Sequence, residues 1–213
     1  MRREKITYYG SYEGLQEKKY LERLKFLISQ NEESKFDVSF MLKNHSGGSP
    51  LEICKYALRT ITFSNIAELK KEERIIAIFD YDFKDEEFIQ ANEYCLKNNI
   101  VNAYSNVNFD LFLLLHKKSY NKQIYTNEGY KEVLCKSFRL SPKSDIKDEK
   151  IIDKIMNQIT LEDVVNAIET AKKICKKTEN SGKVFNRLDG HYEQPYLKIH
   201  LFIEKVLIRC GIL

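Results

Sequence analysis

Acidic residues follow two predicted strands of this sequence. Glu13 lies in the segment YEGLQE after the β-type run at residues 5–9, and Asp80 and Asp82 follow the apolar run at residues 75–79. In an open α/β sheet, the carboxyl ends of parallel strands share one edge and ligands gather there. Three carboxylates that converge repel one another, and a hard divalent cation stabilises them. The spacing therefore predicts a Mg²⁺ or Mn²⁺ site made by Glu13, Asp80 and Asp82.

Ordinary structural roles also account for these residues. An acidic pair at the end of a strand suits the N-terminus of the helix that follows, because the helix dipole stabilises negative charge there. Asp85, Glu86 and Glu87 have that role. Glu13 taken alone is compatible with a plain turn residue. The residues by themselves leave both interpretations open.

The loop NHSGGSP is a candidate phosphate-binding segment. Gly47, Gly48 and Ser49 precede a predicted helix that begins near Pro50, and free backbone N–H groups at a helix N-terminus bind anions. The alternative is a flexible turn with a good cap, since Ser49 and Glu52 have the spacing of a capping box. We weigh these two interpretations about equally.

Other polar residues near the same predicted sheet edge are candidate contacts to nucleic acid. Ser105 and Asn106 follow the short strand at residues 100–104, and Lys84 follows the acidic pair. Lys84 is equally explained as a solvated lysine at a helix start. His116 ends an apolar helix, and a position at the edge of the core is favoured over catalysis for it.

The pattern of apolar residues predicts an α/β fold. Strands are expected at residues 5–9, 36–42, 74–79 and 100–104, and amphipathic helices separate them. The run at 74–79 lacks polar alternation, which is typical of a strand buried on both faces in the middle of a parallel sheet. This order indicates a parallel-sheet core with helices on both faces.

The character of the chain changes after about residue 118. A Lys-, Asn- and Ser-rich stretch is followed by a helix at residues 161–174, with Thr160 and Asp163 spaced as a cap, and by a final helix at 199–207. We therefore expect an α/β core over residues 1–118 and a helical region over 119–213 that packs on it.

Composition excludes several classes of protein. The 213 residues are 43% hydrophobic and 31% charged, which excludes a wholly disordered chain. No apolar run is long enough to span a bilayer. Because no apolar stretch follows the basic start, we expect no signal peptide. The five cysteines are scattered, as expected for reduced thiols in the cytoplasm. A net charge of +4 allows a nucleic-acid partner without requiring one.

Four segments together resemble the RloB family. They are YEGLQEKKYL, GGSPLEICKYA, IIAIFDYD and AYSNVNFDLFLLLH, and the C-terminal QPYLKIHLFIEKVL, with its His200, resembles the closing helix of that family. The second component of the AbiL abortive-infection system against phage also represents this family. The resemblance covers almost the whole chain in the expected order.

The family is similar to Toprim proteins, in which a Glu after the first strand and a DxD after a later strand bind Mg²⁺ and act on phosphodiesters. The resemblance implies a Toprim-like, Rossmann-like core with Glu13, Asp80 and Asp82 as catalytic residues and metal ligands. It implies a Mg²⁺-dependent nuclease of RNA, such as tRNA, or of DNA, within a two-component anti-phage system.

The partner implied by the resemblance is an ATPase of the AAA or ABC type. This chain has no GxxxxGK[ST] phosphate loop of its own. The alternative is a non-catalytic Toprim-like adaptor or regulator bound to that ATPase. An oligomer is compatible with either function, and a membrane partner is expected for neither.

Overall fold

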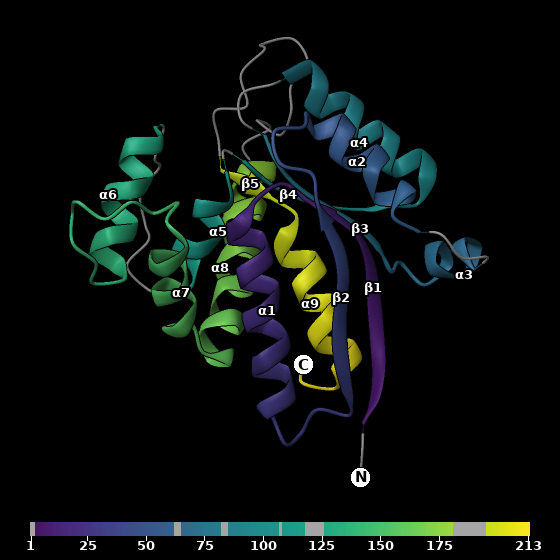
Figure 1. The fold of residues 1–213 in the computed structure, drawn as a ribbon, viewed down its shortest axis with the longest axis horizontal. Helices are drawn as coiled ribbons and strands as arrows, with labels where there is room; N and C mark the ends of the chain where they lie inside the picture. The colour runs from purple at the N-terminus through teal and green to yellow at the C-terminus, as the bar shows by residue number, and fades with distance from the viewer. Residues whose placement is uncertain (1–2, 62–64, 82–84, 107, 118–125, 181–194) are drawn as a thin grey trace.

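The computed structural model describes residues 3–61, 65–81, 85–106, 108–117, 126–180 and 195–213 (Figure 1). The strands are β1 (Glu4–Tyr12), β2 (Phe36–Asn44), β3 (Ile75–Asp80), β4 (Val101–Asn106) and β5 (Tyr196–Leu197). The helices are α1 (Leu15–Gln30), α2 (Pro50–Arg59), α3 (Ile66–Lys71), α4 (Asp85–Asn98), α5 (Phe109–Leu115), α6 (Asn127–Ser137), α7 (Glu149–Asn157), α8 (Leu161–Asn180) and α9 (Ile199–Cys210). The α/β prediction is confirmed.

The strands form one five-stranded sheet in the order β2-β1-β3-β4-β5. The first four are mutually parallel, and β5 pairs with the end of β4 in the antiparallel direction. The apolar run of β3 is the central strand, and its residues from Ile75 to Phe79 are at most 2% exposed. The expectation of a central strand buried on both faces is therefore confirmed.

Helices cover both faces of the sheet. In Figure 1, α2 and α4 lie on one side, whereas α1 and α9 lie on the other, with α6 and α7 farther out beyond α1. The side chains of β3 alternate between the two layers, as the pleat of a strand requires. Ile75, Ala77 and Phe79 join the core against α2 and α4, and Ile76 and Ile78 join the larger core against α1 and α9. This double burial explains the absence of polar residues in the run.

Strand β1 is longer than the sequence indicates. The sequence predicts a strand over residues 5–9, but β1 continues through Gly10 and Ser11 to Tyr12. Gly10 has φ +142°, and a Cβ there would lie 1.8 Å from the carbonyl oxygen of Ile76 on β3. The glycine therefore lets β1 and β3 approach closely, and Glu13 follows the strand directly.

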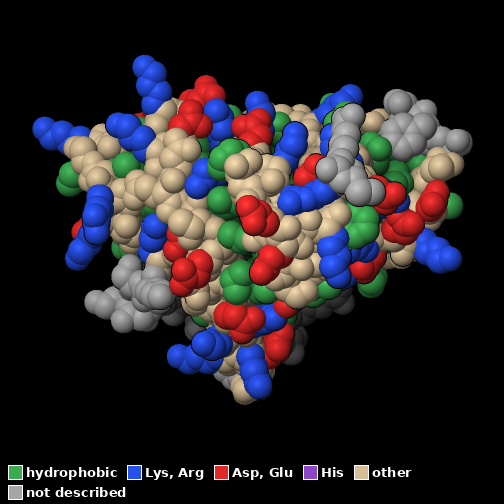
Figure 2. Space-filling model, turned by 90° about the horizontal axis from the view of Figure 1, so that it is seen from below, with side chains coloured by type: hydrophobic (Ala, Val, Ile, Leu, Met, Phe, Trp, Pro, Cys, Tyr) green, Lys and Arg blue, Asp and Glu red, His purple; other side chains and the backbone are tan. Residues whose placement is uncertain are grey.

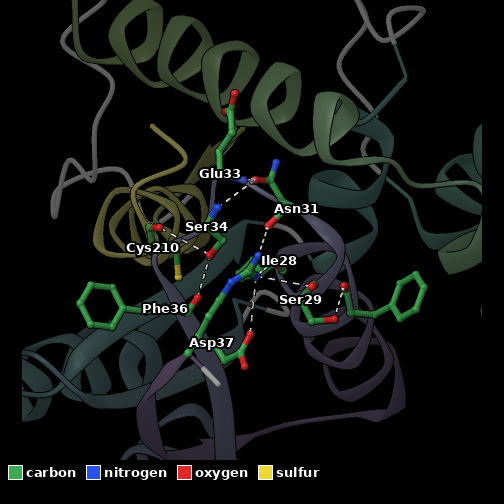
Figure 3. Close-up of polar contacts among 10 residues, drawn as sticks. Ile28, Ser29, Asn31, Glu33, Ser34, Phe36, Asp37 and Cys210 are labelled. Carbon is green, nitrogen blue, oxygen red and sulfur yellow. Dashed lines mark hydrogen bonds and ion pairs between the residues drawn. The ribbon is translucent and has the colours of Figure 1, made fainter. Parts of the chain in front are cut away.

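Polar contacts fasten the turn between α1 and β2 to the C-terminal end of α9 (Figure 3). An Arg3 Nη donates to the carbonyl of Asn31 at 2.8 Å, and the Ser34 hydroxyl donates to the carbonyl of Phe36 at 2.7 Å. The Lys35 N–H donates to the carbonyl of Cys210 at 2.8 Å. The bonds from Arg3 and Lys35 join segments that are far apart in the sequence, whereas the bond from Ser34 lies within the turn.

The region after residue 125 contains the predicted helices and one short strand that was not predicted. Thr160 and Asp163 form the expected cap: the Asp163 N–H donates to the Thr160 hydroxyl at 3.1 Å, and the Asp163 carboxylate accepts the Thr160 N–H at 2.9 Å. Strand β5 precedes α9 and extends the sheet. The predicted domain boundary between residues 118 and 119 falls at a segment outside the described residues, and it stays a prediction.

The five thiols are all buried and free, and those of Cys54 and Cys95 lie 3.3 Å apart between α2 and α4. On the face seen in Figure 2, basic and acidic side chains are interspersed. Over the described residues, no helix combines the length and apolar character needed to cross a bilayer.

Candidate active site

The sheet has a topological switch point between β1 and β3. The chain leaves β1 through α1 to reach β2 on one side, and it later passes through α2 to reach β3 on the other side of β1. Because α1 and α2 lie on opposite faces of the sheet, a crevice opens outside the carboxyl ends of these two strands. Ligands bind at such crevices in open α/β sheets.

Glu13 and Asp80 flank this switch point. Glu13 follows β1, and Asp80 is the last residue of β3. The Glu13 Oε2 accepts the backbone N–H of Asp80 at 3.1 Å, which ties the two strand ends together. The structure thus brings two of the predicted carboxylate residues to one place.

A cleft of about 620 Å³ opens at this point. Its acidic lining residues are Glu13, Glu17, Asp80, Asp110, Glu128 and Asp145. Lys131 of α6 and Lys147 before α7 line the same cleft, as does Asn108. Six carboxylates against two ammonium groups give the cleft a negative potential, which attracts cations.

Four of these acidic residues were not singled out from the sequence: Glu17, Asp110, Glu128 and Asp145. Two of the four are buried. Glu17 in the first turn of α1 is 4% exposed and Asp110 in the first turn of α5 is 7% exposed. Burial, together with the charges of Glu13 and Asp110, raises the pKa of Glu17 to about 7. Burial also raises the pKa of Asp110 to about 6, against a hydrogen bond from the Gln16 amide and the charge of Lys147. Perturbed acids in a cleft are typical of functional sites.

The donor chemistry of the cleft fits a hard divalent cation. Carboxylate oxygens are the ligands that Mg²⁺ prefers, and one or two of them suffice when water and phosphate oxygens complete the shell. Glu13 and Asp80 supply that number. Within the described part of the chain, no three His, Cys, Asp or Glu residues stand close enough to hold a metal together. Asp82, the third predicted ligand, lies outside the described residues.

The glycine loop reaches the cleft only in part. Ser46 and Gly47 line it, whereas Gly48 packs against the ring of His45. Ser49 is the N-cap of α2: its hydroxyl accepts the Glu52 N–H at 3.4 Å, and its own N–H donates to the Glu52 carboxylate at 2.9 Å. The capping role of Ser49 is therefore confirmed, and its contact with phosphate stays a prediction.

Ser105 and Asn106 do not line this cleft. They end β4, where β5 pairs with both of them, and they are 1% and 2% exposed. Asn108, two residues farther on, does line it. Lys84 lies outside the described residues, so its predicted role stays open.

The two histidines of the resembling segments are buried away from the cleft. The His116 Nδ1 lies 2.9 Å from the carbonyl of Phe112, and its Nε2 lies 3.0 Å from the hydroxyl of Tyr20. The first contact requires a proton on Nδ1, so Nε2 accepts from Tyr20. Burial lowers the pKa of both His116 and His200 to about 4. For His116, the structural interpretation is the one that this geometry supports.

Comparison with known proteins gives a match to a protein family. No curated protein and no solved structure shows significant similarity to the chain. The sequence pattern of the family described as RloB-like protein matches residues 12–206, which include Glu13 after β1, the whole of β3 and most of α9. The chain therefore belongs to the RloB-like protein family.

Proposed function

We propose that this protein is a metal-dependent nuclease whose active site is the acidic cleft at the switch point of the sheet. The observation that carries the proposal is the set of carboxyl groups from β1, α1, β3 and α5 in one cleft. Burial of Glu17 and Asp110 costs stability, since their raised pKa values show that ionisation is disfavoured there. A stability cost concentrated at one site is typical of function.

Glu13 and Asp80, together with Asp82, would hold Mg²⁺ or Mn²⁺. When bound, such an ion neutralises the charge that develops on a phosphodiester during cleavage. Glu17 is the acid or base that the structure adds, because a pKa of about 7 suits proton transfer near neutral pH. Its carboxylate oxygen would take a proton from attacking water or return one to the leaving oxygen. The predicted alternative, in which Glu13 itself is the acid or base, stays open.

The cationic groups of the cleft suit a polyanionic substrate. Lys131 and Lys147 line the same cleft as the carboxylates, and there they would contact phosphates that flank the scissile bond. Asn108 would donate a hydrogen bond to the same backbone. The phosphate backbone of a nucleic acid is complementary to these groups. The nucleic acid would be DNA, or an RNA such as tRNA.

Cleavage assays with Mg²⁺ or Mn²⁺ on tRNA, single-stranded RNA and DNA test the proposal. Asp80→Asn and Asp82→Asn should each abolish cleavage and leave the fold intact. Asp37→Asn is the matched control, since Asp37 pairs with Arg3 at the far end of the sheet. If cleavage survives both substitutions in the acidic motif, the nuclease proposal is wrong.

Thermal melts separate the nuclease from the adaptor. If the cleft binds a divalent cation, Mg²⁺ or Mn²⁺ should raise the melting temperature of the unmutated protein and not that of Asp80→Asn. If Mg²⁺ and Mn²⁺ leave the melting temperature unchanged and support no cleavage, a non-catalytic adaptor role explains the protein better.

The proposal extends to a role in anti-phage defence in the cytoplasm, with a co-encoded ATPase as partner. Membership of the RloB-like family supports defence, and the absence of a phosphate-loop motif from the sequence supports a separate ATPase. Cells that express this chain alone, the neighbouring ATPase alone or both are challenged with phage. Protection should need both chains, and full protection by this chain alone would refute the dependence.

A further inference from the structure

A second groove lies at the open edge of the sheet, beside the first half of β4. Its volume is about 500 Å³, and it lies between α4 and α9, which cover opposite faces of the sheet. Strand β5 pairs only with Ser105 and Asn106 at the far end of β4. The start of β4 therefore faces this groove, whereas the acidic cleft lies at the carboxyl ends of the strands.

The backbone of Asn102 points into this edge. The Ser105 carbonyl accepts the Tyr81 N–H across the β3 side, and the Tyr104 carbonyl accepts the Lys198 N–H on the opposite side. Because backbone groups alternate in direction along a strand, Asn102 presents its N–H and C=O on the same side as Tyr104. Among the described residues, no other strand pairs with Asn102 on that side.

The walls of the groove are basic and apolar. Among the described residues that line it, Lys70, Lys71, Lys198 and Lys205 are cationic and Glu73 alone is acidic. Lys205 pairs with Glu73 at 2.7 Å, so three lysines remain in excess at the groove. Leu96 of α4 is 82% exposed and Leu201 of α9 is 42% exposed, and both line the groove.

We propose that this groove binds an extended, acidic segment of another protein, which adds to the sheet as a strand beside β4. Strand addition gives a peptide main-chain hydrogen bonds to an open edge, and pockets for alternate side chains give specificity. Acidic side chains of the segment would meet Lys70, Lys71 and Lys198. Apolar side chains between them would point to the other face of the sheet, where they would meet Leu96 of α4.

The observations favour this occupant over two others. A second copy of this chain would bring a second set of the same lysines to the groove, and like charges oppose that pairing. Nucleic acid would satisfy the lysines but would leave the two exposed leucines and the strand edge without a matching group. The proposal does not depend on the nuclease function, because the groove shares no lining residue with the acidic cleft.

The probes are two labelled peptides of equal charge, Ac-EVEVEVE-NH2 and Ac-EPEPEPE-NH2. The first can form a strand, and the second cannot, because proline lacks the N–H that a strand must donate. Binding to the full chain is followed by fluorescence anisotropy and by the backbone amide signal of Asn102 in NMR. The valine peptide should bind, shift this signal and slow its hydrogen exchange, whereas the proline peptide should do none of these.

Two variants and a control complete the test. The double substitution K70E/K71E should weaken binding of the valine peptide about tenfold, and L96D should weaken it as well. The control K176E/K177E reverses two adjacent, exposed lysines near the end of α8 and should leave binding unchanged. Neither K70E/K71E nor L96D should alter cleavage of a short oligonucleotide.

Several results would overturn the proposal. If both peptides bind equally, or if the valine peptide leaves the Asn102 amide signal unchanged, the groove binds acidic peptides by charge alone and strand addition is wrong. A dimer that K70E/K71E abolishes would assign the edge to a second copy. Displacement of the valine peptide by a single-stranded oligonucleotide that itself shifts the Asn102 signal would assign the groove to nucleic acid.

Discussion

The substitution Glu17→Gln should stabilise the protein at alkaline pH in the absence of metal. Glu17 is buried in the cleft, and Glu13 and Asp110 raise its pKa in addition to burial. Hydrogen bonds from the backbone N–H groups of Glu17 and Gly14 oppose this shift. An amide of the same shape removes the ionisation and keeps the packing.

The magnitude follows from the pKa of the folded state. It rises from 4.5 to about 7, and each unit corresponds to about 1.4 kcal/mol, so ionised Glu17 costs about 3 kcal/mol of stability. The cost is absent below pH 4.5, grows as the pH rises to about 7 and is constant above that. For a chain of this length, 3 kcal/mol corresponds to roughly 6–12 °C in melting temperature.

The assay is thermal melting of both proteins in chelator at pH 4 and pH 8. Glu17→Gln should melt well above the unmutated protein at pH 8 and close to it at pH 4. Glu22→Gln is the control on the same helix, where an exposed pair with Lys18 at 3.8 Å contributes little. If Glu17→Gln melts at or below the unmutated protein at pH 8, the carboxyl group is not under the strain inferred here.

Three further predictions concern the scaffold. Gly10→Ala should lower the free energy of unfolding by ~3 kcal/mol or more, since the added methyl group would clash with the Ile76 carbonyl. Gly47 also has a positive φ but has open space around it, so Gly47→Ala should lower the free energy of unfolding by only about 1 kcal/mol. Urea unfolding of the two variants measures both values. Ser49→Ala should lose the cap of α2 and about 1 kcal/mol by the same measurement, and an unchanged midpoint would contradict that role. The His116 ring should stay neutral down to about pH 4 in an NMR titration of the folded protein. The free energy of unfolding should therefore fall by up to about 3 kcal/mol as the pH falls from 6.5 to about 4, because the ring takes up its proton more readily in the unfolded chain. Protonation near pH 6.5 in the folded protein would refute the burial of this ring.

The elements that sequence alone predicts are those whose signal is local. The run at 75–79 is apolar at every position because helices cover both of its faces, so its central place could be inferred. The caps at Ser49 and Thr160 are likewise local, since donor and acceptor are three residues apart. The approach of Glu13 to Asp80 could be expected once both strands were placed in one parallel sheet.

The features that could not be predicted depend on contacts between distant segments. Gly10 has the appearance of a strand breaker until the position of Ile76 is known. An acid in the first turn of a helix, such as Glu17 or Asp110, ordinarily faces solvent. Their burial becomes visible only when α5 packs beside the start of α1, where the amide of Gln16 donates to Asp110 across 94 positions.

The hydrogen bonds between α9 and the turn between α1 and β2 have a consequence for folding during translation. The core that contains Tyr8 and Leu24 also contains Phe202, Val206 and Leu207 of α9. The Cys210 carbonyl accepts a hydrogen bond from Lys35, in a turn that is synthesised early in translation. While the ribosome is still adding the final helix, the sheet lacks one of its covering layers. Contacts of such long sequence separation form slowly. The acidic cleft, although its residues come mostly from the first part of the chain, should therefore mature only after translation has passed residue 210.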